Sequence, residues 1–362
     1  MEPNESRRAR AAARRAEARS ARGPRVIVAV VVVLLVACLA LGGLVLIGSS
    51  HSPAPTEPTV AAATATPHAT AAVSVTPSGT ASPDSSSSPT PTSTPNPAPQ
   101  LPSLLAAIGD SYSQAYSVSP SYLRDHTQFS WVVGTARGDG VFSLYERFRA
   151  LGAAPTVVDA ATSGRKMDDA PRQAGLVVAA AKKLKAGQTA YVTFELGTND
   201  LCDDPKTDRL DFDVSLGAAV AALKKGLPAG SRILILPVPD FAHFHDITQA
   251  DPTARAAYTT WSFSNRCAPF LGTNSPTSMS DAQAILAYYE ASLLAACTDI
   301  NSTQGIRCTY DAKVTADSDF VIGDLSKVDY FHPSLTGQAK LAQDAWSADV
   351  WAGLPLPANA EQ

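Results

Sequence analysis

The sequence predicts an α/β fold with a central parallel sheet covered by helices on both faces. Near-continuous apolar runs alternate with segments of helical spacing, and strands that are buried on both faces are apolar throughout. Several of these runs end at small or polar residues, and ligands of open α/β sheets bind at that end of the strands. Residues 101–355 suffice for one such domain with a sizeable core.

The first hundred residues do not have a globular composition. Residues 1–25 contain eight arginines against three acidic residues and are predicted to form a basic cytoplasmic tail. Residues 26–48 are an uncharged apolar run of 23 residues, which is long enough to span a bilayer. Because arginines mark the cytoplasmic side, we expect a single-pass transmembrane signal-anchor in the cell membrane, with the globular domain extracellular.

Two other interpretations of the apolar run stay open. A cleaved signal peptide usually has a shorter apolar region, of about 7–15 residues. Residues 35–38 resemble a lipobox with Cys38 as the lipidated residue, although the apolar residues continue to Ile47. Under each of the three interpretations, the rest of the chain is exported from the cytoplasm.

Residues 49–100 are predicted to be a disordered linker. Pro, Thr, Ser and Ala dominate this segment, and such a composition cannot bury a core. At ~3.1 Å per residue in an extended conformation, the linker reaches on the order of 150 Å. This length would hold the domain clear of the membrane and allow contact with a cell wall.

The elements of the globular part follow from apolar runs and helical spacing. The predicted strands are 104–108, 156–160, 190–196 and 232–238. The predicted helices are 142–151, a helix capped by Asp168 or Asp169 and ending near residue 184, 213–227, 281–296 with Asp281 as its cap, and a last helix at 335–350. Residues 112–140 are predicted to form a loop beside the active site.

Residues 239–280 are predicted to be irregular and are rich in aromatic residues. Long irregular segments of compact domains often serve as lids or binding loops. A packed surface excursion is the other interpretation, and both stay open.

The net charge of the globular part argues against one class of partner, and its cysteine count indicates the cellular compartment. Residues 1–100 hold 8 of the 29 basic and 5 of the 33 acidic residues, so residues 101–362 have a net charge of −7, which argues against nucleic acid. The four cysteines beyond Cys38 suggest two disulfides in an oxidising compartment. We favour Cys297–Cys308, which closes a short loop, and Cys202–Cys267. No metal is expected, since there is no CxxC and the histidines lack ligand spacing.

Five residues near strand ends and near the C-terminus suit acyl transfer to a serine. This chemistry needs a nucleophile, a base, a group that orients the base, and donors for the oxyanion. Ser111 follows the first strand as the candidate nucleophile, and His332 is the candidate base with Asp329 to orient it. The candidate oxyanion donors are the N–H groups of Ser111 and Gly164 and the side chain of Asn199.

Each of these residues also has a purely structural interpretation. Ser111 could cap a helix, and Gly164 could serve a turn that requires a positive φ. Asn199 could be a turn residue, and His332 a surface histidine before Pro333. Asp329 lies three residues before His332, which favours the catalytic interpretation of His332, although Asp240 precedes His243 at the same spacing.

On these residues the chain resembles the SGNH hydrolase (GDSL-type esterase/lipase) family. The family blocks match Gly109-Asp110-Ser111, Gly164, Gly197-Thr198-Asn199-Asp200 and Asp329-x-x-His332, in family order, within residues 104–345. The resemblance implies a flavodoxin-like three-layer α/β/α sandwich. It also implies hydrolysis of carboxylic esters through an acyl-serine, without a cofactor. Tyr112 stands where the family name has Leu.

We therefore expect a membrane-tethered extracellular serine esterase or lipase. Its expected substrate is a small-molecule, lipid or carbohydrate ester. Three alternatives stay open. A carbohydrate O-acyltransferase could use the same site, and a lipase proper could use the aromatic segment 239–280 as an acyl pocket. A catalytically silent wall-binding module would use the linker as its main functional part.

Overall fold

The computed structural model describes residues 99–118, 123–203, 209–261, 267–271, 277–311 and 320–357. All of them belong to the compact unit Thr90–Gln362. The predicted basic tail and membrane anchor, Cys38, and all but the last two residues of the linker lie outside these ranges. Within the described ranges, no helix is both long enough and apolar enough to cross a membrane.

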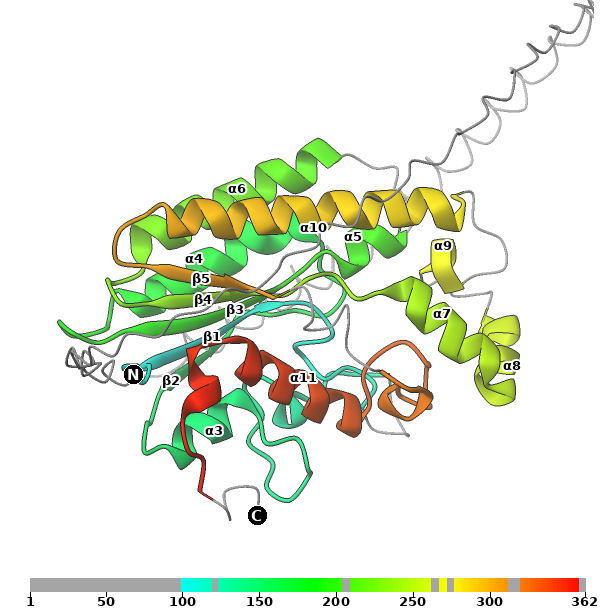
Figure 1. Cartoon of the computed structure of the whole chain (residues 1–362), viewed down its shortest axis with the longest axis horizontal. Helices are drawn as coiled ribbons and strands as arrows, with labels where there is room; N and C mark the ends of the chain where they lie inside the picture. Colours follow the sequence, from blue (N-terminus) through cyan, green and yellow to red (C-terminus); the bar gives the residue numbers. More distant parts are fainter. Residues whose placement is uncertain are drawn as a thin grey trace, which may run out of the picture. The chain divides into compact units, whose positions relative to one another are not determined.

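The described residues form a sheet of five parallel strands with helices on both of its faces (Figure 1). The strands are β1 (Leu104–Gly109), β2 (Thr156–Asp159), β3 (Ala190–Glu195), β4 (Arg232–Ile235) and β5 (Arg307–Tyr310). Their order in space is β2-β1-β3-β4-β5 and every pairing is parallel. This order is the flavodoxin-like one, and it confirms the predicted α/β class with a central parallel sheet.

The helices divide between the two faces of the sheet. They are α3 (Leu144–Ala150), α4 (Ala170–Ala181), α5 (Thr198–Asp203), α6 (Arg209–Gly226), α7 (Phe241–Ala250), α8 (Pro252–Trp261), α9 (Ala268–Leu271), α10 (Met279–Asn301) and α11 (Leu335–Ala348). Short 3₁₀ segments lie at Thr127–Phe129, Met167–Asp169, Ile322–Asp324 and Val350–Gly353. Figure 1 shows α4, α6 and α10 on one face and α3 and α11 on the other, so the sheet is the middle layer.

Burial accounts for the correct prediction of the inner strands, whereas β2 was predicted correctly although its residues are exposed or half-buried. All six residues of β1 and all six of β3 are buried, and both strands lie inside the sheet. The fifth strand, β5, was not predicted. It lies at an edge, its four residues Arg-Cys-Thr-Tyr are exposed or half-buried, and a short polar edge strand lacks the apolar run that marks an inner one.

The prediction that residues 239–280 are irregular was wrong over the parts that the structure describes. Asp240 caps α7, since its carboxylate accepts hydrogen bonds from the N–H groups of Ala242 (3.0 Å) and His243 (3.1 Å). Helices α8 and α9 follow. The aromatic side chains of Phe241, Phe244 and Phe270 are at most 2% exposed, so they belong to the core and do not line an open acyl pocket.

Two predicted helix caps also differ from the structure. Helix α10 begins at Met279, and Ser278 caps it by accepting a hydrogen bond from the N–H of Asp281 (3.1 Å). Asp169 makes no capping hydrogen bond to α4. Its carboxylate instead pairs with Arg172 at 2.7 Å, because an arginine three residues further on lies on the same helix face.

The described part of the chain contains two disulfides, in the predicted pairing. Cys202 in α5 is bonded to Cys267, which directly precedes α9. Cys297 in α10 is bonded to Cys308 in β5. The first bridge therefore attaches the helix that carries Asn199 to the segment around α9, and the second attaches α10 to the edge of the sheet.

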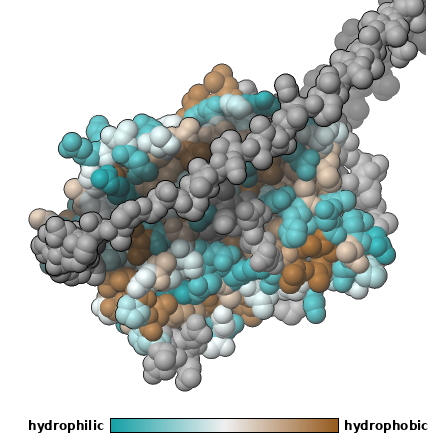
Figure 2. Space-filling model, viewed as in Figure 1, coloured by the Kyte–Doolittle hydropathy of each residue, from teal (hydrophilic) through white to brown (hydrophobic). Residues whose placement is uncertain are grey.

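The surface seen in Figure 2 has mixed polarity, with separate brown apolar areas among teal polar ones. Large apolar side chains that are exposed come from different elements, for example Leu176 on α4, Leu294 on α10 and Val350 after α11. Isolated apolar residues of this kind are normal on a protein surface.

Candidate active site

The turn that carries Ser111 follows β1 and is fixed by the side chain of Gln173 from α4. The Gln173 amide accepts from the N–H of Gly109 (2.8 Å) and donates to the Gly109 carbonyl (3.0 Å). A Cβ at position 109 would lie 2.3 Å from the Ser113 Oγ. Glycine is therefore required there, and the chain leaves the sheet along one tightly held path before Ser111.

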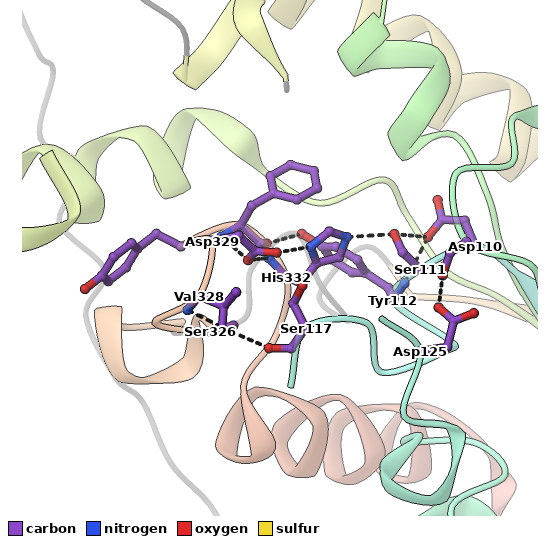
Figure 3. A network of polar contacts seen from close by, with 12 residues as sticks. Asp110, Ser111, Tyr112, Ser117, Asp125, Ser326, Val328, Asp329 and His332 are labelled. Atoms are coloured by element: carbon purple, nitrogen blue, oxygen red, sulfur yellow. Dashed lines mark hydrogen bonds and ion pairs between the residues drawn. The ribbon is translucent and has the colours of Figure 1, made fainter. Parts of the chain in front are cut away.

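Ser111, His332 and Asp329 form one continuous chain of hydrogen bonds (Figure 3). The Nε2 atom of His332 lies 2.9 Å from the Ser111 Oγ, and its Nδ1 atom lies 2.7 Å from the Asp329 Oδ2. Because a carboxylate only accepts, Nδ1 carries the proton and Nε2 is free to accept the proton of the serine hydroxyl. The structure thus brings the three sequence-predicted catalytic residues together.

The aspartate is held in its ionised form by the groups around it. The other oxygen of Asp329, Oδ1, accepts from the N–H groups of Phe331 (3.1 Å) and His332 (2.9 Å). Burial alone would raise the pKa of Asp329, but the charge and hydrogen bonds of His332 outweigh it, so this pKa lies below its ordinary value. An ionised Asp329 can stabilise the imidazolium that forms during proton transfer.

Aromatic rings surround the imidazole of His332. The ring centroids of Tyr116 and Phe331 both lie 4.8 Å from that of His332, and the centroid of Tyr112 lies 5.8 Å away. Ser111 and His332 are only 4% and 2% exposed. These contacts restrict the rotation of the imidazole and keep it aligned with Ser111.

Gly164 and Asn199 follow the ends of β2 and β3, as predicted. Gly164 has φ +76°, a conformation that favours glycine, and its N–H has no acceptor within the described part of the chain. The Nδ2 of Asn199 donates to the Asp110 Oδ2 (3.0 Å) and to the Arg165 carbonyl (2.9 Å). Both amide hydrogens of Asn199 are therefore engaged here, and its donor role stays a prediction that requires one of them to be released.

Asp110 is a site residue that was not assigned a role from the sequence. Its carboxylate accepts from the N–H of Tyr112 (3.0 Å) and from Asn199, and it lies 3.5 Å from the Ser111 Oγ. Burial, together with the charge of Asp200, raises the pKa of Asp110 to about 7 despite these hydrogen bonds. Asp110 thus links Ser111 to Asn199.

Two further acids lie close to Asp110, one buried (Glu195) and one half-buried (Asp200). Glu195, the last residue of β3, accepts from the Ser113 hydroxyl at 3.0 Å, and burial together with the charge of Asp110 holds its pKa well above the ordinary value. Asp200 accepts from the N–H of Met167 at 2.9 Å, and burial raises its pKa to about 6. A charged residue within the apolar run 190–196 was the signal that could have identified Glu195 from the sequence.

No group of three or more His, Cys, Asp or Glu residues within the described ranges is arranged to hold a metal ion.

The chain is similar to one known protein family and to several solved structures. The sequence profile of the family described as GDSL-like lipase/acylhydrolase matches residues 105–345. Among solved structures, TesA is similar at 17% sequence identity and a TM-score of 0.41, with 68% of this chain and 97% of that chain covered. The psychrotrophic esterase EstA from Pseudoalteromonas sp. is similar at 15% identity and a TM-score of 0.40, with 68% and 96% covered.

A third similar structure is the aryl esterase of M. smegmatis, at 14% identity and a TM-score of 0.38, with 68% of this chain and 99% of that chain covered. The comparison with curated proteins found no match. The family profile extends from β1 into α11, so the matched span contains every block of the candidate site.

Proposed function

The chain belongs to the GDSL-like lipase/acylhydrolase family, and we propose that it hydrolyses carboxylic esters through an acyl-serine intermediate formed on Ser111. The observation that carries this proposal is the unbroken relay from the Ser111 hydroxyl through His332 to Asp329, at 2.9 Å and 2.7 Å. These separations lie within the range over which a base takes a proton from a nucleophile.

The proposed reaction has two steps. Ser111 attacks the ester carbonyl while the Nε2 of His332 takes its proton, and Asp329 stabilises the resulting imidazolium. His332 then donates this proton to the leaving alcohol. In the second step His332 takes a proton from a water molecule that attacks the acyl-serine. The protonated His332 then returns this proton to the Ser111 oxygen as the bond between that oxygen and the acyl group breaks, and the carboxylic acid and the free enzyme are released.

The oxyanion of each tetrahedral intermediate needs hydrogen-bond donors. The backbone N–H groups of Ser111 and Gly164 suit this role, since neither has an acceptor among the described residues. Asn199 becomes the third donor when one of its amide hydrogens leaves Asp110 or the Arg165 carbonyl. A negative oxyanion is a stronger acceptor than a neutral carbonyl, which favours the exchange with Arg165.

We further propose that this domain acts outside the cell and is tethered to the membrane by residues 26–48. The basic tail, the apolar run and the Pro- and Thr-rich linker support this location. The two disulfides also support it, because such bonds persist in oxidising compartments. The proposed substrates are small-molecule, lipid or carbohydrate esters that reach the outer side of the membrane.

The proposal is tested with full-length protein and p-nitrophenyl esters from acetyl to palmitoyl. Hydrolysis by the wild type that is lost in Ser111→Ala would support it, and the dependence on chain length would define the acyl group. A folded wild type that hydrolyses none of these esters would contradict it. Transfer of the acyl group to a sugar in preference to water would identify an acyltransferase instead.

A further inference from the structure

The two catalytic turns come from distant parts of the chain and are joined by a second contact besides the Ser111–His332 hydrogen bond. We call residues 109–113 the nucleophile turn and residues 326–333 the base turn. The hydroxyl of Tyr112 donates to the carbonyl of Phe331 at 2.9 Å. Tyr112 directly follows Ser111 and Phe331 directly precedes His332, so this bond spans the two turns next to the reacting side chains.

The base turn has a conformation that needs support from outside. Tyr330 has φ +47°, in the left-handed region that a residue with a bulky side chain rarely adopts. Three consecutive carbonyls of the turn accept hydrogen bonds from other residues. The Tyr330 carbonyl accepts from the Tyr258 hydroxyl of α8, the Phe331 carbonyl from Tyr112, and the His332 carbonyl from the N–H of Ser326 (2.8 Å). Of these three donors, only Tyr112 belongs to the nucleophile turn.

Tyr112 lies beside Ser111 and His332 (Figure 3) and is held there by burial, ring contacts and a hydrogen bond to its backbone. It is 1% exposed, and its ring lies edge-on to the rings of Phe331 and His332, with centroids 6.1 Å and 5.8 Å away. Its carbonyl accepts from the Gln338 Nε2 of α11 at 3.0 Å. Because the backbone and the ring of Tyr112 are both held in place, its hydroxyl determines the position of the Phe331 carbonyl that it binds.

We propose that Tyr112 is a positioning residue whose hydroxyl sets the separation between Ser111 and His332 by tying the nucleophile turn to the base turn. The inference rests on the proposed serine mechanism and adds a residue to it. The family name has Leu at this position, and Leu has no hydroxyl with which to make this contact. The departure from the family motif noted in the sequence thus has a specific role in this chain.

The bond persists over the whole pH range of an assay. Burial, followed by the charges of Asp110, Glu195 and Asp329, holds the pKa of Tyr112 well above its ordinary value. The hydroxyl therefore stays protonated and remains a donor. Its removal should slow proton transfer from Ser111 by the same factor at every pH, because no titrating group is lost.

Tyr112→Phe removes the hydroxyl and keeps the ring contacts. Proton transfer needs a separation of about 2.6–3.2 Å, and a 1 Å displacement at a reacting centre costs on the order of 10²-fold in rate. A smaller displacement of the base turn should lower kcat by about tenfold. KM should change little, because the substituted group does not face the substrate.

The matched control is Tyr258→Phe. This substitution also removes one tyrosine hydroxyl from a base-turn carbonyl, but from α8 and not from the nucleophile turn. If Tyr112 acts by coupling the two turns, Tyr258→Phe should lower Tm by a similar amount and reduce the rate much less than Tyr112→Phe does.

The experiment measures the rate constant for inactivation of the full-length protein by a fluorophosphonate, beside kcat, KM and Tm. The reagent reports activation of Ser111 without requiring the physiological substrate. The inference predicts roughly tenfold slower inactivation for Tyr112→Phe, to the same extent across the pH range. Tyr112→Leu should also react slowly, and it replaces Tyr112→Phe if that variant does not fold.

The outcomes separate the inference from the proposed function. A wild type that the fluorophosphonate does not inactivate would contradict the serine mechanism itself. Inactivation of the wild type and Tyr112→Phe at equal rates would overturn the role of Tyr112 and leave the mechanism standing. Equal slowing in Tyr112→Phe and Tyr258→Phe would also overturn it, since general stability of the base turn would then account for both.

Discussion

Replacing Asp329 with Asn tests how the base is oriented while changing a single atom. In the structure the Oδ1 of Asp329 accepts two backbone N–H groups and its Oδ2 faces the Nδ1 of His332 at 2.7 Å. The carbonyl of an asparagine can keep the two backbone bonds, so the base turn should retain its conformation. The NH₂ group then faces Nδ1, and two donors cannot share that bond.

The imidazole of His332 must then move its proton to Nε2, which can no longer accept the proton of Ser111. The same change in a Ser-His-Asp triad lowers kcat by about 10⁴-fold, which corresponds to about 5 kcal/mol of lost transition-state stabilisation. We expect a loss of that order in kcat for a p-nitrophenyl ester, with little change in KM.

The matched control is Asp349→Asn. Asp349 is also buried, but it pairs with Arg232 at 3.0 Å and has no contact with the site. This variant should lower Tm and retain kcat. A loss of less than tenfold in a folded Asp329→Asn protein would refute the reasoning, because the orientation of His332 would then come from another group.

Three further predictions follow from the site and its supports. Asn199→Ala should lower kcat by about 10²–10³-fold through loss of an oxyanion donor, and near-normal steady-state turnover would count against that role. The pKa of Asp110 rises from 3.8 to about 7 and that of Glu195 rises well above 4.5, so the folded protein binds these protons more tightly than the unfolded chain. The free energy of unfolding should therefore fall as pH rises from about 4 to 7, and less steeply in Glu195→Gln; urea titrations that give equal slopes would contradict this. Loss of the Cys297–Cys308 bridge should cost about 2–3 kcal/mol of stability with kcat retained, whereas loss of Cys202–Cys267 should also lower kcat because α5 carries Asn199. Equal kcat values for the two double Cys→Ala variants would contradict the second claim.

The inner strands were predicted correctly because their local pattern and their burial agree, and β2 was predicted from its local pattern alone. The runs that became β1 and β3 are apolar and fully buried, so the sequence alone could identify them. The blocks at Ser111, Gly164 and Asn199 follow directly from these strands and β2, since the carboxyl ends of parallel strands meet at one edge of a sheet.

The parts that were missed depend on contacts between distant residues. Strand β5 is recognisable only by its pairing with β4. The aromatic residues around α7 belong to the core because the catalytic base turn packs on them, with Phe241 stacked on Phe331 at 5.2 Å. No local pattern near Tyr112 indicates a bond to a carbonyl 219 residues away.

The engagement of Asn199 could not be predicted from the sequence either. The block Gly197-Thr198-Asn199-Asp200 indicates which side chain could donate, but not which acceptors that side chain binds. The Asp110 carboxylate and the Arg165 carbonyl are brought to it by β1 and by the segment after β2. The sequence thus predicts Asn199 as an oxyanion donor, while the folded chain determines which acceptors compete for its amide hydrogens.

The central claim is that Ser111 is a nucleophile activated by His332, and mapping a covalent adduct tests it most directly. Full-length protein is treated with a fluorophosphonate, digested, and analysed by mass spectrometry. The account predicts one adduct, on the peptide that contains Ser111, absent in Ser111→Ala and strongly slowed in His332→Ala. An adduct on another residue, or none on the folded wild type, would contradict it.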